Sequence, residues 1–486
     1  MSAFKPGPHY NNSAMMMDFY EMTMANAYYL TGQKDTRVLY DMFFRRVPDG
    51  GGYAIACGLE SLVEHLLNFH FEPADIEYFR SKGIFDEEFL EYLSHYRFTG
   101  DIYAVPEGTI VYPNEPLIRV EADAIGATLI ETQLLTFMNH QSRIATKASR
   151  ICRGGRVIME FGSRRAMGND AANLGARAAY IAGAVGTANC LADQKYGVPA
   201  LGTMAHAFVE MFPTEYEAFA AYARIYPDNC TLLIDTYDVL HSGLPNAIRV
   251  HKEILEPMGK RLKGIRLDSG DLSYLSKKVR RILNEAGMED CQICVSNGLD
   301  EFTMADLVLQ GAAIDSFGIG ERLITAASDP VFGGVYKLAA VEENGELVPR
   351  IKVSENEAKT TNPGKKMVWR LHNKDTGFAI CDVITLDGEE IREGEPYHCV
   401  DPRKPWKNIV VENFTATRIL RPVILQGRLV QPLPSLDQIR AYTLHQLENE
   451  VWEEEQRLYN PHQHYVNMSR DAYDLKMRLR DEHHTR

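Results

Sequence analysis

The chain has 486 residues, and 52 lysines and arginines against 66 aspartates and glutamates give a formal net charge of −14. Apolar residues make up 45 % and charged residues 24 %, close to the globular average, which excludes a largely disordered chain. The acidic balance argues against a nucleic-acid-binding protein, because such a protein needs a basic face for the phosphates. A local cluster of arginines could still bind a small anionic substrate.

The sequence carries no pattern typical of export or of a membrane span. Residues 1–12 contain Pro, Gly and Asn but no apolar core, so no signal peptide is expected. There is no run of about eighteen apolar residues, and the most apolar stretch, 178–192, is interrupted by polar residues and glycine. The eight cysteines are dispersed, with one C-x-x-C pair at Cys291 and Cys294. We expect buried, reduced thiols in a cytoplasmic protein.

The N-terminal part shows a mixed pattern of helices and strands. Leucines recur on one helical face after residue 55, and turn signals with Pro and Gly separate short strands after residue 100. A Gly-Gly pair ends the last helical segment. In chain order we expect a helix over 15–30, a strand over 38–44, a helical segment over 55–98, short strands over 101–121 and a long helix over 126–150.

Between Val157 and Val341, short apolar runs alternate with amphipathic helical segments. Such alternation is typical of parallel strands joined by crossover helices. About six or seven strands in a stretch of this length favour an irregular barrel. No G-x-G-x-x-G follows the first run, which argues against a dinucleotide fold. The expected strands are 157–161, 200–204, 232–235, 264–267, 293–296, 312–317 and, closing the series, 335–341.

After residue 341 the pattern changes again. Strands alternate with turns such as Asn344-Gly345 and Asp387-Gly388, and a charged helical tail begins at Ser435. We read that tail as a solvated or packing helix. The sequence therefore predicts three consecutive domains. They are an N-terminal α/β domain over 1–150, an α/β barrel over 151–341, and a β-rich C-terminal segment with a helical tail over 342–486.

Polar residues and glycines follow nearly every predicted barrel strand, at the strand end where barrels and open α/β sheets keep their active sites. Phe161 could stack on a flat ring, and Arg164 could bind a carboxylate or phosphate through parallel hydrogen bonds. His206 could act as an acid, a base or a nucleophile. Each has a structural alternative, namely a core phenylalanine, a surface arginine or a hydrogen-bonded structural histidine.

The segment 264–272, which reads GIRLDSGDL, is the sharpest local signal. Arg266 and Asp268 alternate on one face of a strand. The turn 269–271 then opens a helix, whose free N–H groups can bind an anion, and a nearby carboxylate can hold Mg²⁺ against a diphosphate. Asp271 could instead be only the helix cap.

Together these residues indicate a pocket for a flat ring that carries anionic groups. The glycines of Gly318-Ile319-Gly320 offer a further backbone cradle. An aldolase-like or other barrel lyase would also fit, but no lysine ends a barrel strand, which disfavours a Schiff-base mechanism.

Several motifs, in the same order and along nearly the whole chain, resemble the nicotinate phosphoribosyltransferase family. Four of them are DFYEMTMA at 18–25, FFRR at 43–46, GGVYKL at 333–338 and KTTNPGKK at 359–366. The others are the segments 160–168, 202–209, 233–243 and 266–272. The resemblance implies the α/β type II phosphoribosyltransferase fold, an irregular α/β barrel with an N-terminal α/β domain, and a homodimer whose active sites are shared between subunits.

The resemblance also implies a reaction of NAD salvage. Nicotinate and 5-phosphoribosyl 1-diphosphate would give nicotinate mononucleotide and diphosphate, with Mg²⁺ and with ATP hydrolysis through a phosphohistidine. His206 looks like that histidine, Asp235 and Asp268 like catalytic carboxylates, and Asp268 like the magnesium ligand. Phe161 and Tyr20 of the partner subunit resemble the two faces of a nicotinate stack. The other residues implied in substrate binding are Arg164, Thr203, Arg266, Ser269, Gly270, Gly318 and Gly320.

Two alternatives remain open. In the related nicotinamide phosphoribosyltransferases an aspartate follows the Gly-Thr pair after the first barrel strand, whereas residues 186–189 here read Gly-Thr-Ala-Asn, which puts Ala188 at that position. An aspartate would repel the carboxylate of nicotinate, and alanine does not. A ligand-sensing relative without activity is the other alternative, and the intact Arg266, Asp268 and His206 argue against it.

The chain departs from the family pattern at two places. Met17 stands where a threonine is usual, and Glu321 follows the Gly-x-Gly where a threonine is often found. Arg322 could supply the phosphate contact that the hydroxyl would otherwise make.

Overall fold

A computed structural model describes residues 14–355 and 359–484, so the segment 1–12 considered above lies outside the described residues. The chain forms two compact units. One holds the residues up to 142 together with those from 331 onward, and the other holds 143–330. This differs from three consecutive domains, because the boundary expected at 150 falls inside helix α6 (Glu131–Cys152) and the one at 341 falls inside strand β12 (Gly334–Glu343).

The first unit contains a seven-stranded sheet in which three strands from the N-terminal part of the chain lie between two pairs of strands from the C-terminal part. β12 pairs antiparallel with the strand Arg37–Phe44, with Val38 opposite Val341. The prediction that 335–341 closes the barrel is therefore wrong, because an apolar run shows that a strand forms but not which sheet it joins. The order is β13 (Glu346–Pro349), β12, β1 (Arg37–Phe44), β5 (Ile118–Asp123), β3 (Asp101–Ala104), β19 (Arg421–Leu425) and β20 (Arg428–Leu429).

Several helices of the first unit begin at a proline or at a capping carboxylate. The helical stretch expected over 55–98 forms three helices, because Pro73 and Asp86 each start a new one. The long helix expected over 126–150 is two helices, α5 and α6. The elements are α1 (Phe19–Leu30), α2 (Leu59–Leu67), α3 (Pro73–Ser81), α4 (Glu87–His95), α5 (Ala124–Leu129) and the pair β2 (Ala54–Ile55) and β4 (Ile110–Val111).

The same unit holds a six-stranded sheet near the C-terminus. Residues alternate across its two faces, so that Arg370 pairs with buried Asp382 at 2.7 Å on one face while Trp369 and Leu371 enter an apolar cluster on the other. The expected helical tail is two helices. The elements are β17 (Asn408–Val411), β16 (Tyr397–Val400), β21 (Val466–Met468), β15 (Ala379–Leu386), β14 (Lys366–Asn373), β18 (Phe414–Arg418), α15 (Leu436–Asn449) and α16 (Arg470–His484).

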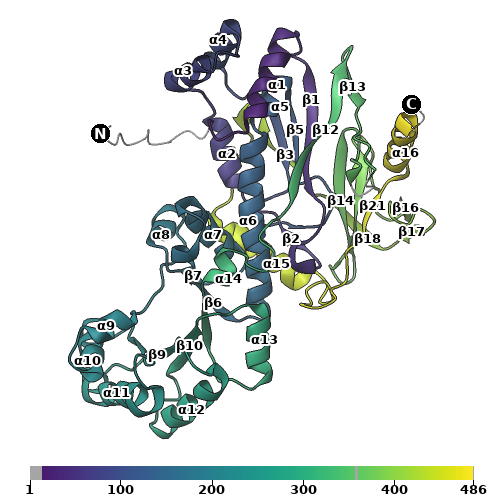
Figure 1. The fold of residues 1–486 in the computed structure, drawn as a ribbon. Coiled ribbons are helices and arrows are strands. Elements are labelled where there is room, and N and C mark those ends of the chain that lie inside the picture. Colours follow the sequence, from purple (N-terminus) through teal and green to yellow (C-terminus); the bar gives the residue numbers. More distant parts are fainter. Residues whose placement is uncertain (1–13, 356–358, 485–486) are drawn as a thin grey trace. The chain divides into compact units, whose positions relative to one another are not determined.

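The second unit is the α/β unit that the strand–helix alternation predicted. Its six strands are all parallel, and helices α9 to α12 lie around β9 and β10 (Figure 1). The strands are β7 (Gly186–Thr187), β6 (Val157–Glu160), β11 (Ser316–Ile319), β10 (Gln292–Ser296), β9 (Gly264–Leu267) and β8 (Thr231–Leu233). The helices are α7 (Asn169–Ile181), α8 (Cys190–Tyr196), α9 (His206–Glu210), α10 (Glu215–Ile225), α11 (Leu244–Val250), α12 (Leu272–Glu285), α13 (Glu301–Leu309) and α14 (Glu321–Ile324).

One strand expected in this unit is almost absent. The segment 200–204 makes a single bridge, between Ala200 and Thr187, and otherwise runs as an extended loop. The short strand β7, which contains Thr187, occupies the sheet position beside β6 instead.

All eight cysteines are free thiols, and six of them are buried. Over residues 14–355 and 359–484, no helix is both long and apolar enough to cross a membrane.

Glu21 on α1 gives a prediction for stability against pH. The fully buried carboxyl accepts hydrogen bonds from the Thr132 backbone N–H at 3.0 Å and from the Thr132 hydroxyl, and burial raises the pKa of Glu21 from 4.5 to about 7. Between these values the folded chain holds a proton that the unfolded chain has released, so stability falls as the pH rises. Glu21→Gln removes the titration and should gain up to about 3 kcal/mol over the wild type at pH 8.

The measurement is chemical denaturation of both proteins at pH 5 and pH 8. The variant's advantage should be larger at pH 8. An advantage that is the same at both pH values would show that Glu21 is already ionised in the folded protein.

Candidate active site

The carboxyl ends of the parallel strands in the second unit carry the residues singled out in the sequence. Phe161 follows β6, Asp235 follows β8, Asp268 follows β9 and Gly320 follows β11. Because the strands are parallel, these ends lie at the same edge of the sheet, where α/β proteins bind their ligands.

Asp235 and Asp268 are joined at this edge. Asp235 Oδ2 accepts hydrogen bonds from the Asp268 backbone N–H at 2.9 Å and from the Ser269 hydroxyl at 2.6 Å. The Ser296 hydroxyl donates to Asp268 Oδ1. The side chain of Asp235 is 1 % exposed, and its Oδ1 has no hydrogen-bond partner. A buried carboxylate oxygen without a partner is costly, so this atom marks a place that a cation or a hydroxyl would complete.

His206 faces both carboxylates. Its Nε2 lies 4.0 Å from Asp235 Oδ1 and 3.9 Å from Asp268 Oδ2, and its Nδ1 lies 3.1 Å from the Thr236 hydroxyl. The side chain is 40 % exposed, so a substrate can reach it. The structure thus holds one ring nitrogen of His206 through Thr236 and presents the other toward the carboxylate pair.

Arg266 is oriented by the loop that replaces the missing strand. Its Nη1 donates to the Thr203 hydroxyl at 2.9 Å and to the Met204 carbonyl at 3.3 Å, and its Nη2 lies 3.8 Å from Asp268 Oδ1. Its Nε is buried and has no hydrogen-bond partner. The guanidinium is therefore held in place with an N–H left over for an anion.

Phe161 packs directly on Gly318, near the end of β11, and on Gly320, just after it. A Cβ at Gly318 would lie 2.5 Å from Phe161 Cδ2, and a Cβ at Gly320 would lie 3.1 Å from the Phe161 carbonyl oxygen. The Phe161 N–H donates to the Ile319 carbonyl at 2.8 Å. The Phe161 ring lies so close to residue 318 that only glycine fits there. The ring has a fixed, half-buried position at the end of β6.

Ala188 lies beside the end of the same strand. Its N–H donates to the Glu160 carbonyl at 2.8 Å. The Glu160 side chain is buried and accepts from the Thr187 hydroxyl at 2.6 Å and from the Gly162 N–H, and burial raises the pKa of Glu160. This carboxyl links the loop after β6, which carries Phe161, to Thr187 at the end of β7, next to Ala188.

The other predicted residues have less defined surroundings. Arg164 is exposed in the short helix η2 (Ser163–Arg165). Gly270 has a φ of +83° ahead of α12, and Asp271 caps that helix by accepting from the Tyr274 N–H at 2.9 Å. Asp271 is thus the helix cap, the reading left open above. Arg322 pairs with Asp300 at 3.2 Å.

Tyr20 belongs to the first unit, on α1, and its side chain is exposed. Partial burial and the neighbouring Glu131 raise the pKa of Tyr20, so its phenol stays neutral. A neutral aromatic ring suits the stacking role assigned to it.

Thr236 contacts His206 and Ser296 contacts Asp268, and neither was predicted as part of the site. Ser296 ends its strand and could have been included on position alone, as Asp268 was. Thr236 follows Asp235 directly, and nothing in the sequence indicates that it contacts a histidine thirty residues away.

The residues fit a magnesium site completed by substrate. Within the described part of the chain, no group of three or more His, Cys, Asp and Glu side chains is placed to hold a metal ion. Mg²⁺ commonly binds one or two carboxylates together with substrate phosphates, and needs no such group. The Asp268 carboxylate and the unpartnered Asp235 Oδ1 would supply those ligands.

Models of one protein family match most of the chain. The model of the nicotinate phosphoribosyltransferase (NAPRTase) family matches residues 157–383, and those of its N-terminal and C-terminal domains match residues 15–139 and 365–476.

Individual proteins match over nearly the full length. Nicotinate phosphoribosyltransferase of Bacillus subtilis (strain 168) is 42 % identical, over 95 % of this chain and 94 % of its own. The crystal structure of human nicotinic acid phosphoribosyltransferase is 30 % identical with a TM-score of 0.84, over 96 % of this chain and 99 % of the human one. Nicotinate-nucleotide pyrophosphorylase from Pyrococcus furiosus shares the fold, with a TM-score of 0.70 at 23 % identity, over 92 % and 99 %.

Proposed function

The chain belongs to the nicotinate phosphoribosyltransferase family, and we propose that it joins nicotinate to 5-phosphoribosyl 1-diphosphate with the help of ATP. The products would be nicotinate mononucleotide and diphosphate, which serve NAD salvage. The observation that supports this most is the group of Asp235, Asp268, His206 and Arg266 at one edge of the parallel sheet.

The transfer step needs positioning and charge compensation more than a strong nucleophile. The bond from ribose C1 to the diphosphate oxygen breaks, positive charge develops on the ribosyl ring, and the nicotinate ring nitrogen bonds to C1. Asp235 and Asp268 carry negative charge that can stabilise this transition state. Asp268 would also hold Mg²⁺, which neutralises the departing diphosphate. Phe161 would hold the flat ring, and the Arg266 Nε–H would bind an anionic substrate group.

ATP would act through His206. When the Thr236 hydroxyl accepts a hydrogen bond from Nδ1–H, Nε2 presents its lone pair and can attack the γ-phosphorus. The new N–P bond forms as the bond between that phosphorus and the bridging oxygen breaks, and ADP leaves. The phosphohistidine adds negative charge and acceptor oxygens close to Arg266, which can order the substrate loops.

The proposal is tested by detecting products with nicotinate and with nicotinamide in parallel, each with and without ATP. Nicotinate mononucleotide, formed faster with ATP, is the expected product. Nicotinamide mononucleotide as the main product would favour the nicotinamide enzyme, and no turnover with either would favour a ligand-sensing protein.

We predict that nicotinate is preferred over nicotinamide by about 10–150-fold in kcat/KM, because a neutral amide loses a charge-assisted pair worth roughly 1.5–3 kcal/mol. Ala188, beside the end of β6, leaves room for the carboxylate without repelling it. Steady-state kinetics with both substrates measures the ratio. Ala188→Asp should reduce the preference, whereas equal kcat/KM values in the wild type would rule out this account.

We also propose a homodimer in which Tyr20 of the partner subunit completes each site. Tyr20→Ala and Arg266→Ala chains should each be inactive. If the two chains are co-expressed in equal amounts, about half of the dimers contain one chain of each kind. Each of these mixed dimers has one intact site and one site that lacks both residues. About a quarter of the wild-type activity should therefore return. Activity of the purified co-expressed protein measures this. A fully active monomer at assay concentration would contradict it.

A further inference from the structure

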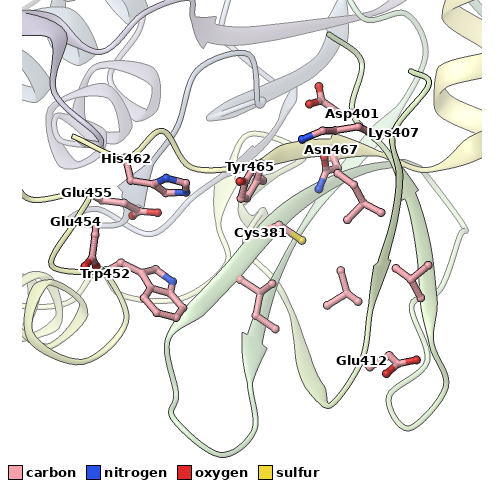
Figure 2. A pocket seen from close by; sticks show the side chains of 14 residues that line it. Cys381, Asp401, Lys407, Glu412, Trp452, Glu454, Glu455, His462, Tyr465 and Asn467 are labelled. Atoms are coloured by element: carbon pink, nitrogen blue, oxygen red, sulfur yellow. The ribbon is translucent and has the colours of Figure 1, made fainter. Parts of the chain in front are cut away.

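A cavity of about 670 Å³ opens on the C-terminal six-stranded sheet (Figure 2). Its walls come from β15, β17 and β21 and from the loop after α15, all within the first unit. None of the residues assigned to phosphoribosyl transfer lines it. Its volume lies within the range of small-molecule sites, about 300–1,000 Å³.

Three buried polar side chains line this otherwise largely apolar space. Asp401 and Glu455 are hydrogen-bonded to neighbouring residues, and the third is Asn467. Asn467 on β21 is paired with Val383 on β15 and is 1 % exposed. Neither its Nδ2 nor its Oδ1 has a hydrogen-bond partner, and the neighbouring thiol of Cys381 is at best a weak one. Native proteins rarely leave both ends of a buried amide unpaired, so this amide indicates a missing partner.

On the opposite face of the same sheet, Arg370 and Asp382 form a buried ion pair. There the Arg370 guanidinium makes two hydrogen bonds, at 2.8 and 2.7 Å, to the Asp382 carboxylate. Asn467, on the cavity face, has no such partner.

The mouth of the cavity is aromatic and acidic. The rings of Trp452 and Tyr465 are 42 % and 43 % exposed, and the Trp452 Nε1–H donates to the Ala379 carbonyl at 2.6 Å, which fixes the indole. The carboxylates of Glu412 and Glu454, together with other acidic residues of the lining, outnumber the single lysine. An aromatic ligand would find a contact surface here, and an anionic one would be repelled.

We propose that this cavity binds a neutral aromatic carboxamide. The amide N–H of the ligand donates to Asn467 Oδ1, its carbonyl accepts from Nδ2, and its ring packs on the aromatic wall. Two amides that face each other form two parallel hydrogen bonds, one in each direction, which an ether or a carboxylate cannot do because neither carries a donor. This site is separate from the proposed transfer reaction.

The probe is 4-fluorobenzamide, with 4-fluorobenzoate as the matched anion, titrated into the full chain and followed by fluorine NMR. Saturable binding of the amide is expected, with the benzoate at least about tenfold weaker. Asn467→Leu should weaken amide binding by at least about tenfold. The rim variant Glu412→Gln should leave amide binding unchanged and strengthen benzoate binding.

Three outcomes would overturn the proposal. Displacement of the amide by nicotinate would place it in the transfer site. Unchanged binding to a folded Asn467→Leu protein would place it elsewhere, and absence of saturation below about 10 mM would mean that water alone fills the cavity. Thermal melting and nicotinate turnover report separately on folding and on the proposed function. If Asn467→Leu does not fold, Val410→Trp, at an exposed position of the rim, should block the cavity and abolish binding.

Discussion

Asp268→Asn is expected to lower kcat/KM for phosphoribosyl transfer by about 10²–10³-fold, the loss typical of removing one preorganised electrostatic group. The substitution keeps the shape of the side chain and its hydrogen bond from Ser296, but removes the charge that faces His206 Nε2 at 3.9 Å and pairs with Arg266 at 3.8 Å. It also removes the carboxylate proposed to hold Mg²⁺. Steady-state kinetics at saturating Mg²⁺ measures the loss.

Asp271→Asn is the matched control, because Asp271 lies three residues along the same segment and serves as the cap of α12. Asparagine caps a helix about as well as aspartate, so kcat/KM should stay within about threefold of the wild type. Equal losses in both variants would mean that the segment tolerates no change, and that Asp268 has no role in charge compensation.

His206→Ala should abolish ATP stimulation and formation of the phosphoenzyme while keeping the fold. The side chain is 40 % exposed and its Nδ1 contacts one hydroxyl, so little packing is lost. Slow transfer without ATP should remain, because the carboxylate pair and Arg266 stay in place. The measurement is acid-labile label from γ-labelled ATP, with thermal melting to check folding.

His241 provides the control for this experiment. It is a strongly exposed histidine in the segment after β8, paired with Asp238 at 3.1 Å. His241→Ala should keep both the label and the response to ATP. Label that persists in folded His206→Ala protein would assign the phosphoacceptor to another residue.

The α/β character of residues 143–330 could be predicted because each buried parallel strand is a short apolar run followed by a turn. β9 begins and ends at the predicted residues, and β6 ends one residue earlier than expected. The strand at 335–341 formed as predicted but joined a different sheet. Its register with β1 depends on contacts between segments almost three hundred residues apart, which periodicity does not contain.

The candidate site was predictable as a set of strand ends but not as a set of contacts. Asp235 and Asp268 could be named because each follows a strand. That the Asp268 N–H bonds to Asp235 depends on β8 and β9 being neighbours in the sheet, and the sequence does not contain that order. The contact between the Thr236 hydroxyl and His206 likewise depends on which segments are neighbours in the fold. The orienting role of Thr203 on Arg266 depends on a loop that we expected to be a strand.

The pairing of β1 with β12 also bears on synthesis. While the ribosome is still making residues 143–330, β1 can pair with β5 on one side, and its other edge has no partner until residues 334–343 emerge. An open edge with buried residues such as Leu39 and Met42 beside it can pair with other chains. The contiguous second unit, in contrast, can fold as soon as it leaves the tunnel. Nascent chains truncated near residue 330 should therefore contain a folded second unit and an aggregation-prone N-terminal part.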